Sequence, residues 1–184
     1  MRVREVSRAL SMVVSRLEEL LAAAPKTGLK ASMYLGVVSS LSRLAEDAAT
    51  AARLAECIAT ANQACKQRGG LLHCSTGCAS IEAAKTDGET LLWKYSSNAG
   101  SVRVADGRVE INTEEAKLAI EPGKAEVSLP SGEGWVTIEV DLRSIDDSIG
   151  KAYFIKYAIR KVGKLLRTLQ WDLRSCARAR AITC

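Results

Sequence analysis

Hydrophobic and polar residues alternate along the chain with two different periods, and the changes of period divide the sequence into three regions. Apolar residues recur every three or four positions up to residue 68, every second position over 89–142, and again every three or four positions from residue 144. A period near 3.6 predicts amphipathic helices, and a period of two predicts strands with one buried face. The expected order is helix, helix, linker, sheet and long helix.

The first region predicts two helices joined by a turn. Residues 3–24 form the first expected helix, which ends at Pro25. Residues 29–68 form the second, whose alanine-rich middle favours helix and permits close approach of another helix. We interpret Gly69-Gly70 as its stop. The linker that follows has the weakest pattern in the chain, and we expect only a short helix there, over residues 81–85.

The second region predicts a six-stranded antiparallel meander with one wet face, because short turns separate cleanly alternating runs. Asp106-Gly107 is its clearest two-residue hairpin signal. Alternate residues, such as Val109 and Ile111, are expected to face inward, where the long helices are the segments able to cover them. The expected strands are 89–96, 101–105, 108–112, 117–121, 124–129 and 135–142.

These elements predict an α+β fold, in which a six-stranded antiparallel meander sheet packs against long amphipathic helices, two N-terminal and one C-terminal. Residues 1–86 would form a helical hairpin with a Cys-containing linker, and residues 87–184 the meander and the last helix, packed together as one unit. No apolar run approaches the roughly 20 residues of a membrane span. The charged N-terminal residues do not resemble a secretory signal, so we expect a cytoplasmic protein without membrane contact.

The last region predicts one long helix over residues 144–182, with an apolar seam and a cationic face. Ser144, with Asp147 three residues later, is the expected N-cap. Residues 144–184 carry nine Lys or Arg and three Asp, whereas residues 85–143 carry seven cations and eleven acids. The positive charge is therefore concentrated on a single element.

This cationic face is the main functional signal in the sequence. Arg160, Arg167 and Arg174 lie seven residues apart, and Tyr157 and Trp171 fall among them. Guanidinium groups suit phosphate and aromatic rings stack on bases, so we expect a nucleic-acid interface. The alternative is a solvated helix face whose cations favour the helix C-terminus. The expected binding residues are Lys156, Arg160, Lys161, Lys164, Arg167, Trp171, Arg174 and Arg178.

Catalytic motifs are absent from the sequence. It contains no P-loop, no dinucleotide-binding glycine motif, no HExxH and no EF-hand loop, and it has a single histidine. We therefore expect a non-catalytic binding or scaffold subunit without a cofactor, which contacts the nucleic-acid backbone. Two alternatives are a structural protein that forms a homo-oligomer or larger assembly through its helical seams, and a carrier with an apolar cavity between sheet and helix.

The six cysteines are interpreted mainly as disulfide partners. If the second and last helices run antiparallel, one register pairs Cys65 with Cys176 and Cys57 with Cys184, because each pair of numbers sums to 241. Cys74 and Cys78 would form a local disulfide or remain thiols. Together with His73 they are also weak candidates for a metal site, although their Cys-x3-Cys spacing lacks the usual paired pattern.

Amide residues are scarce, with three Asn and three Gln in 184 residues. Hyperthermophile proteins are depleted in these thermolabile residues and tolerate intracellular disulfides. The composition therefore favours a hyperthermophilic, archaeal source.

Overall fold

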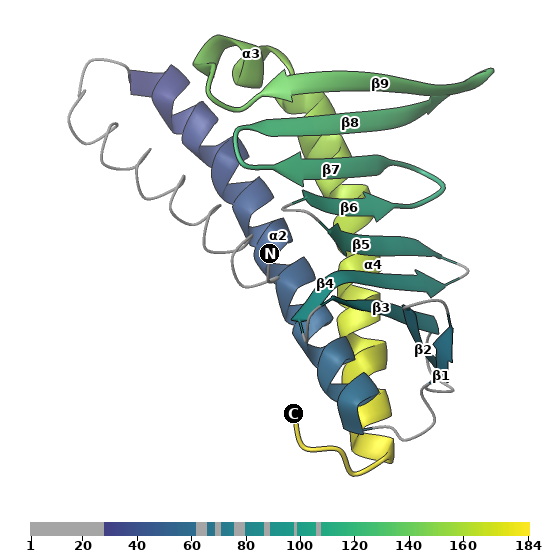
Figure 1. Cartoon of the computed structure of the whole chain (residues 1–184). Helices are drawn as coiled ribbons and strands as arrows, with labels where there is room; N and C mark the ends of the chain where they lie inside the picture. Colours follow the sequence, from purple (N-terminus) through teal and green to yellow (C-terminus); the bar gives the residue numbers. More distant parts are fainter. Residues whose placement is uncertain are drawn as a thin grey trace.

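The fold is α+β in a computed structural model that describes residues 28–61, 66–68, 71–75, 80–86, 89–97, 99–105 and 108–184. Helix α2 (Gly28–Ala61) precedes an antiparallel sheet, and helices α3 (Ile145–Gly150) and α4 (Ala152–Ala179) follow it. Both long helices lie on one side of the sheet and cross its strands (Figure 1). The helix expected over residues 3–24 lies outside the described residues.

The sheet contains nine described strands, each antiparallel to its neighbours in sequence order. The expected count of six is wrong, because β4–β9 match the expected strands in position and β1–β3 add three more. The meander itself is confirmed, and Ala105 of β5 pairs with Arg108 of β6 on either side of Asp106-Gly107, which lie outside the described residues. The strands are β1 (Lys66–Arg68), β2 (Leu71–Ser75), β3 (Ser80–Thr86), β4 (Glu89–Ser97), β5 (Gly100–Ala105), β6 (Arg108–Asn112), β7 (Lys117–Glu121), β8 (Lys124–Ser131) and β9 (Gly134–Asp141).

Two segments expected to be helical are strands. The second helix ends at Ala61 and not at residue 68, and Arg68 of β1 pairs with Leu71 of β2. Gly69-Gly70 themselves lie outside the described residues, between two paired strands, and Gly-Gly is also favoured in two-residue hairpins. Residues 81–85 lie in β3, which pairs with strands on both sides. Pairing within a sheet overrides the helix propensity of so short a segment.

The core lies between the sheet and the two long helices. Alternate residues of β5–β8 are buried against the helices, as the period of two predicts. In β9 only Val140 is buried, while Val136 is 53% exposed because its end of the strand lies far from both helices (Figure 1). The fully buried residues include Ile58 of α2, Ile111, Leu118 and Ile120 of the sheet, and Ile155, Leu166, Leu169 and Leu173 of α4.

The two long helices run parallel, so the antiparallel condition on which the cysteine register depended does not hold (Figure 1). Lys30, near the start of α2, pairs with Asp146 of α3 at 3.4 Å. Further along, the amide of Gln170 in α4 donates to the backbone oxygen of Asp47 at 3.1 Å. The meander carries the chain from the end of α2 across the sheet to β9, beside the start of α2. Helix α4 must therefore run back in the direction that α2 takes.

A disulfide joins Cys57 of α2 to Cys184, with an S–S distance of 2.02 Å. This pair was expected, but it was derived from an antiparallel register of the two helices. A different feature brings the two cysteines together. After α4 the chain reverses, with the Ile182 N–H donating to the oxygen of Ala177, so that the tail returns beside the end of α2. Cys176 is also disulfide-bonded. Its expected partner, Cys65, lies outside the described residues.

The single helix expected over residues 144–182 is divided at Lys151. Ser144 caps α3 as expected, because its Oγ accepts from the Asp147 N–H at 3.2 Å. The Asp147 carboxylate accepts in turn from the Asp141 N–H at the edge of β9, at 2.8 Å. These bonds hold α3 against the sheet and direct the chain into α4. Helix α4 is unbroken and carries all the expected binding residues.

No helix in the described part of the chain combines the length and the apolar character that crossing a membrane requires.

Candidate nucleic-acid interface

An exposed row of residues follows α4 on the side opposite its buried seam, and we call it the basic stripe. Its members lie three or four residues apart, so they share one face of the helix. At 1.5 Å per residue the row is about 33 Å long. The basic stripe consists of Lys156, Arg160, Lys164, Arg167, Trp171, Arg174 and Arg178, all of them exposed.

The six cations of the basic stripe have no carboxylate partner in the described part of the chain, where the ion pairs of α4 involve other residues. Arg160 instead lies 5.5 Å from the ring of Tyr157. Lys161, expected among the binding residues, is different, because its Nζ donates to the Glu115 carboxylate at 2.6 Å. Seven of the eight expected residues therefore lie on the basic stripe, and Lys161 lies beside it with its charge already paired.

The aromatic residues are only partly where the sequence predicts them. Trp171 is 70% exposed between Arg167 and Arg174. Tyr157, the second expected ring, is half-buried and lies close to cations of its own helix. Tyr153 is 77% exposed, and we missed it although its spacing of four residues from Tyr157 was visible in the sequence. Trp171 and Tyr153 are thus the most exposed rings of this helix, ahead of Phe154 at 38%.

A cleft of about 270 Å³ separates α4 from the loop between β6 and β7. Thr113 shapes this loop, because its Oγ1 accepts from the N–H groups of Glu115 and Ala116, at 3.2 and 3.0 Å, and donates to the oxygen of Ala116 at 2.9 Å. The hydrogen bond from Lys161 lowers the pKa of Glu115. The cleft is lined by Ala99, Thr113, Glu114, Glu115, Lys161, Lys164, Leu165 and Thr168.

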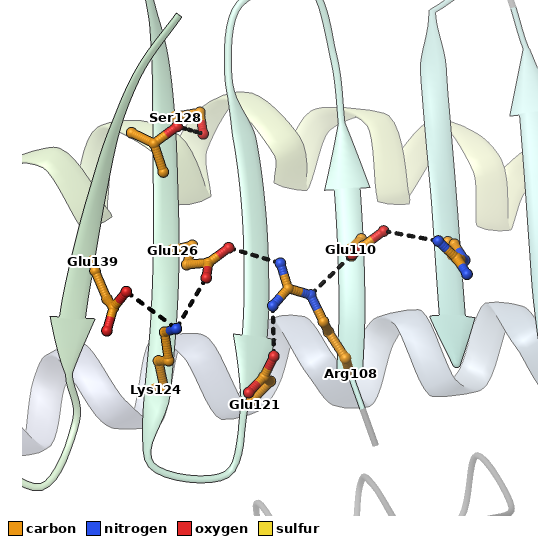
Figure 2. Close-up of polar contacts among 9 residues, drawn as sticks. Arg108, Glu110, Glu121, Lys124, Glu126, Ser128 and Glu139 are labelled. Carbon is orange, nitrogen blue, oxygen red and sulfur yellow. Dashed lines mark hydrogen bonds and ion pairs between the residues drawn. The ribbon is translucent and has the colours of Figure 1, made fainter. Parts of the chain in front are cut away.

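The outer face of the sheet carries a second group of charges, which are paired with one another (Figure 2). Arg108 donates to three carboxylates on three strands, those of Glu110 at 2.9 Å, Glu121 at 2.5 Å and Glu126 at 2.7 Å. Lys124 bonds to Glu126 and to a further carboxylate of β9, each at 3.1 Å. The bonds from Arg108 and Lys124 lower the pKa of Glu126. Each of these cations therefore already has carboxylate partners on the same face of the sheet.

The weaker candidates gain no support from the described residues. His73 and Cys74 lie in β2, and Cys78 lies outside the described residues. No three His, Cys, Asp or Glu side chains in the described segments gather closely enough to hold a metal ion. Both described clefts, the one beside α4 and a smaller one around Arg108, open at the surface and do not form an enclosed apolar cavity.

Comparison of the chain with protein-family models, with curated proteins and with solved structures found no match.

Proposed function

We propose that this protein binds nucleic acid through the basic stripe and contacts mainly the sugar–phosphate backbone. The observation that carries the proposal is an exposed row of six cations that no described carboxylate neutralises. Such a row can release the counterions condensed on a nucleic acid, which is the main source of sequence-independent affinity. Four of the cations are arginines, whose guanidinium groups bind phosphate oxygens in pairs.

Nucleic acid suits the basic stripe better than other polyanions because the row includes an exposed ring. Trp171 lies between two arginines, where its face can stack on an unpaired base while they hold the neighbouring phosphates. Sulfated sugars and acidic peptides offer no comparable flat aromatic partner. The tryptophan therefore favours single-stranded nucleic acid, or an unpaired segment, as the ligand.

The same row argues against recognition of a particular sequence. Asn and Gln, which with Arg make most of the base-specific contacts, are absent from the basic stripe. Gln170 lies next to it, but its amide bonds to the backbone of α2. The proposed binding is therefore sequence-tolerant.

The test is a series of electrophoretic shift measurements with single- and double-stranded DNA and RNA at two salt concentrations. We expect affinity to fall steeply with salt, with a slope of about −0.7 per neutralised phosphate on single strands and about −0.9 on duplex DNA. Affinity that does not change with salt, or no retention of any oligonucleotide at low salt, contradicts the proposal.

A matched pair of charge reversals locates the interface. The double variant Arg167→Glu/Arg174→Glu changes the net charge by the same amount as Arg43→Glu/Arg53→Glu, which alters exposed residues of α2. We expect the first to weaken binding more than tenfold and the second less than threefold, because only the first reverses the field at the phosphates. Equal losses would show that net charge alone controls binding.

The amide-poor composition and the Cys57–Cys184 disulfide support a hyperthermophilic, archaeal source as part of this proposal. The proposed cytoplasmic location is compatible with the disulfide, because intracellular hyperthermophile proteins tolerate such bonds. Thermal unfolding well below about 70 °C contradicts the hyperthermophilic source, since hyperthermophile proteins unfold at higher temperatures.

A further inference from the structure

Glu115 places a negative charge beside the cations of α4. It lies in the loop between β6 and β7, 46 residues from Lys161 in the sequence, and its carboxylate accepts from the Lys161 ammonium group at 2.6 Å. Lys164 and Arg160 of the basic stripe also lie near enough to influence this carboxylate. A negative group of the protein itself thus stands beside the row that we propose to bind phosphate.

The loop holds this carboxylate in place. Thr113 bonds to the backbone of Glu115 and Ala116, and its own N–H donates to the oxygen of Ala116 at 2.9 Å. The turn is short and closed by these bonds, so the Glu115 side chain projects toward α4 from a fixed base. The neighbouring acid, Glu114, also lines the cleft, but it makes no ion pair with a described residue.

We propose that the cleft between this loop and α4 is a phosphate subsite of the nucleic-acid interface, which the Glu115 carboxylate fills until a backbone phosphate displaces it. This inference rests on the proposed function. Carboxylate and phosphate oxygens accept from the same ammonium donors. Lys161 would transfer its hydrogen bond from Glu115 to the phosphate, and Lys164 at the rim of the cleft would provide a second cation.

The Glu115–Lys161 pair is suited to such an exchange because water reaches both partners. The exposed fractions of the two side chains are 59% and 25%. Ion pairs in contact with solvent contribute little net stability, so they are readily replaced. A phosphate in the cleft meets several cations together, whereas the carboxylate of Glu115 bonds to Lys161 only.

The experiment compares Glu115→Gln with Glu114→Gln, which removes the same charge from the same loop without breaking the ion pair. The probe is a single-stranded oligonucleotide at several salt concentrations. We expect Glu115→Gln to raise affinity about two- to fivefold, the range of a solvent-exposed ion pair. The salt slope should change little, because the same phosphate occupies the cleft in both proteins and the gain comes from the ion pair that the variant no longer has to break. Glu114→Gln should change affinity less than twofold.

The outcomes separate the inference from the function on which it rests. Equal effects of the two variants, or an unchanged affinity of Glu115→Gln, overturn the subsite while wild-type binding still supports the function. If neither the wild type nor Glu115→Gln retains the oligonucleotide, both proposals fail. Adding Lys161→Met to Glu115→Gln should abolish the increase in oligonucleotide affinity. If the increase persists, a group other than Lys161 provides it. Thermal unfolding by circular dichroism verifies that each variant is folded.

Discussion

The outer face of the sheet and the basic stripe are built from similar cations, and they differ in the charges that lie opposite them. On the sheet, Arg108 and Lys124 alternate across strands with glutamates, and every described carboxylate of Figure 2 reaches a cation. Side chains directly opposite on paired strands lie about 5 Å apart, so strands of mixed charge neutralise one another. This face uses its charges to join strands.

On α4 the neighbours of each cation at spacings of three and four residues are mostly further cations or aromatic rings. Lys156 and Arg160, Arg160 and Lys164, and Arg174 and Arg178 each lie four residues apart. Like charges at this spacing destabilise a helix by roughly 0.2–0.5 kcal/mol per pair. These pairs therefore do not stabilise the helix, as we expect of a surface that meets an external polyanion.

The largest effect that we predict concerns the covalent connection of α4 to α2. Cys57→Ser removes a crosslink between residues 127 apart. It should lower the free energy of unfolding by about 4–5 kcal/mol in the chain-entropy model. Denaturation of the variant and the wild type by guanidinium without reductant measures this loss, because reductant would also break the disulfide of Cys176. Binding by the folded variant should change less than twofold, because the basic stripe ends before the tail. An unchanged unfolding midpoint would contradict the prediction.

The second prediction separates the two surfaces. Arg108→Met leaves three carboxylates of the sheet without their shared donor. It should lower the free energy of unfolding by about 1.5–3 kcal/mol, the range for hydrogen bonds to charged groups, and leave oligonucleotide affinity within twofold. Arg103→Met is the matched control, since Arg103 makes a single ion pair at 3.7 Å and its loss should matter much less. Weaker binding by Arg108→Met would assign the sheet a part in the interface.

The third prediction compares exposed tryptophans on the two surfaces. Trp171→Ala should weaken single-strand binding about tenfold, because one stacked base contributes roughly 1–3 kcal/mol. Its stability should stay within about 0.5 kcal/mol. Trp135→Ala removes a ring of the sheet that lies 4.1 Å from Lys117, and should leave affinity unchanged. Equal losses in the two variants would count against stacking on α4.

Local pattern predicted much of this fold, and failed where one segment could satisfy two structures. The period of two and the Asp106-Gly107 signal predicted β5 and β6 correctly. Gly69-Gly70 suits a helix stop as well as a hairpin, and only pairing with neighbouring strands decides between them. The direction of α4 could not be predicted from the cysteine register. The meander determines it, because its last strand returns the chain to the edge of the sheet where α2 begins.

The site residues that spacing predicted correctly depend only on local sequence, and the one that it misjudged depends on a distant contact. Helical spacing alone placed Arg160, Arg167 and Trp171 on one exposed face of α4. Spacing could not predict that Lys161 is paired, because its partner Glu115 comes from a loop 46 residues away and is positioned by Thr113. Nothing near either residue in the sequence marks the contact. Sequence patterns thus identify the cations of a surface, and the fold decides which of them remain free.

The smallest predicted effect is an asymmetric response of the two surfaces to acid. Hydrogen bonds from Arg108 and Lys124 lower the pKa of Glu126 below its ordinary value of 4.5. Its contribution to stability is therefore complete above about pH 4.5 and is lost as pH falls through the lower pKa of the folded state. The basic stripe has no ion pair with a described carboxylate to lose in this way. Glu126→Gln should be less stable than the wild type by up to about 1 kcal/mol at pH 7, and this difference should shrink toward pH 3.

Unfolding by urea at pH 7, 5 and 3 measures this difference in stability, with Glu133→Gln in the exposed β8–β9 turn as the control. A difference that stays constant over this range would show that Glu126 stabilises the sheet by packing and not by its charge.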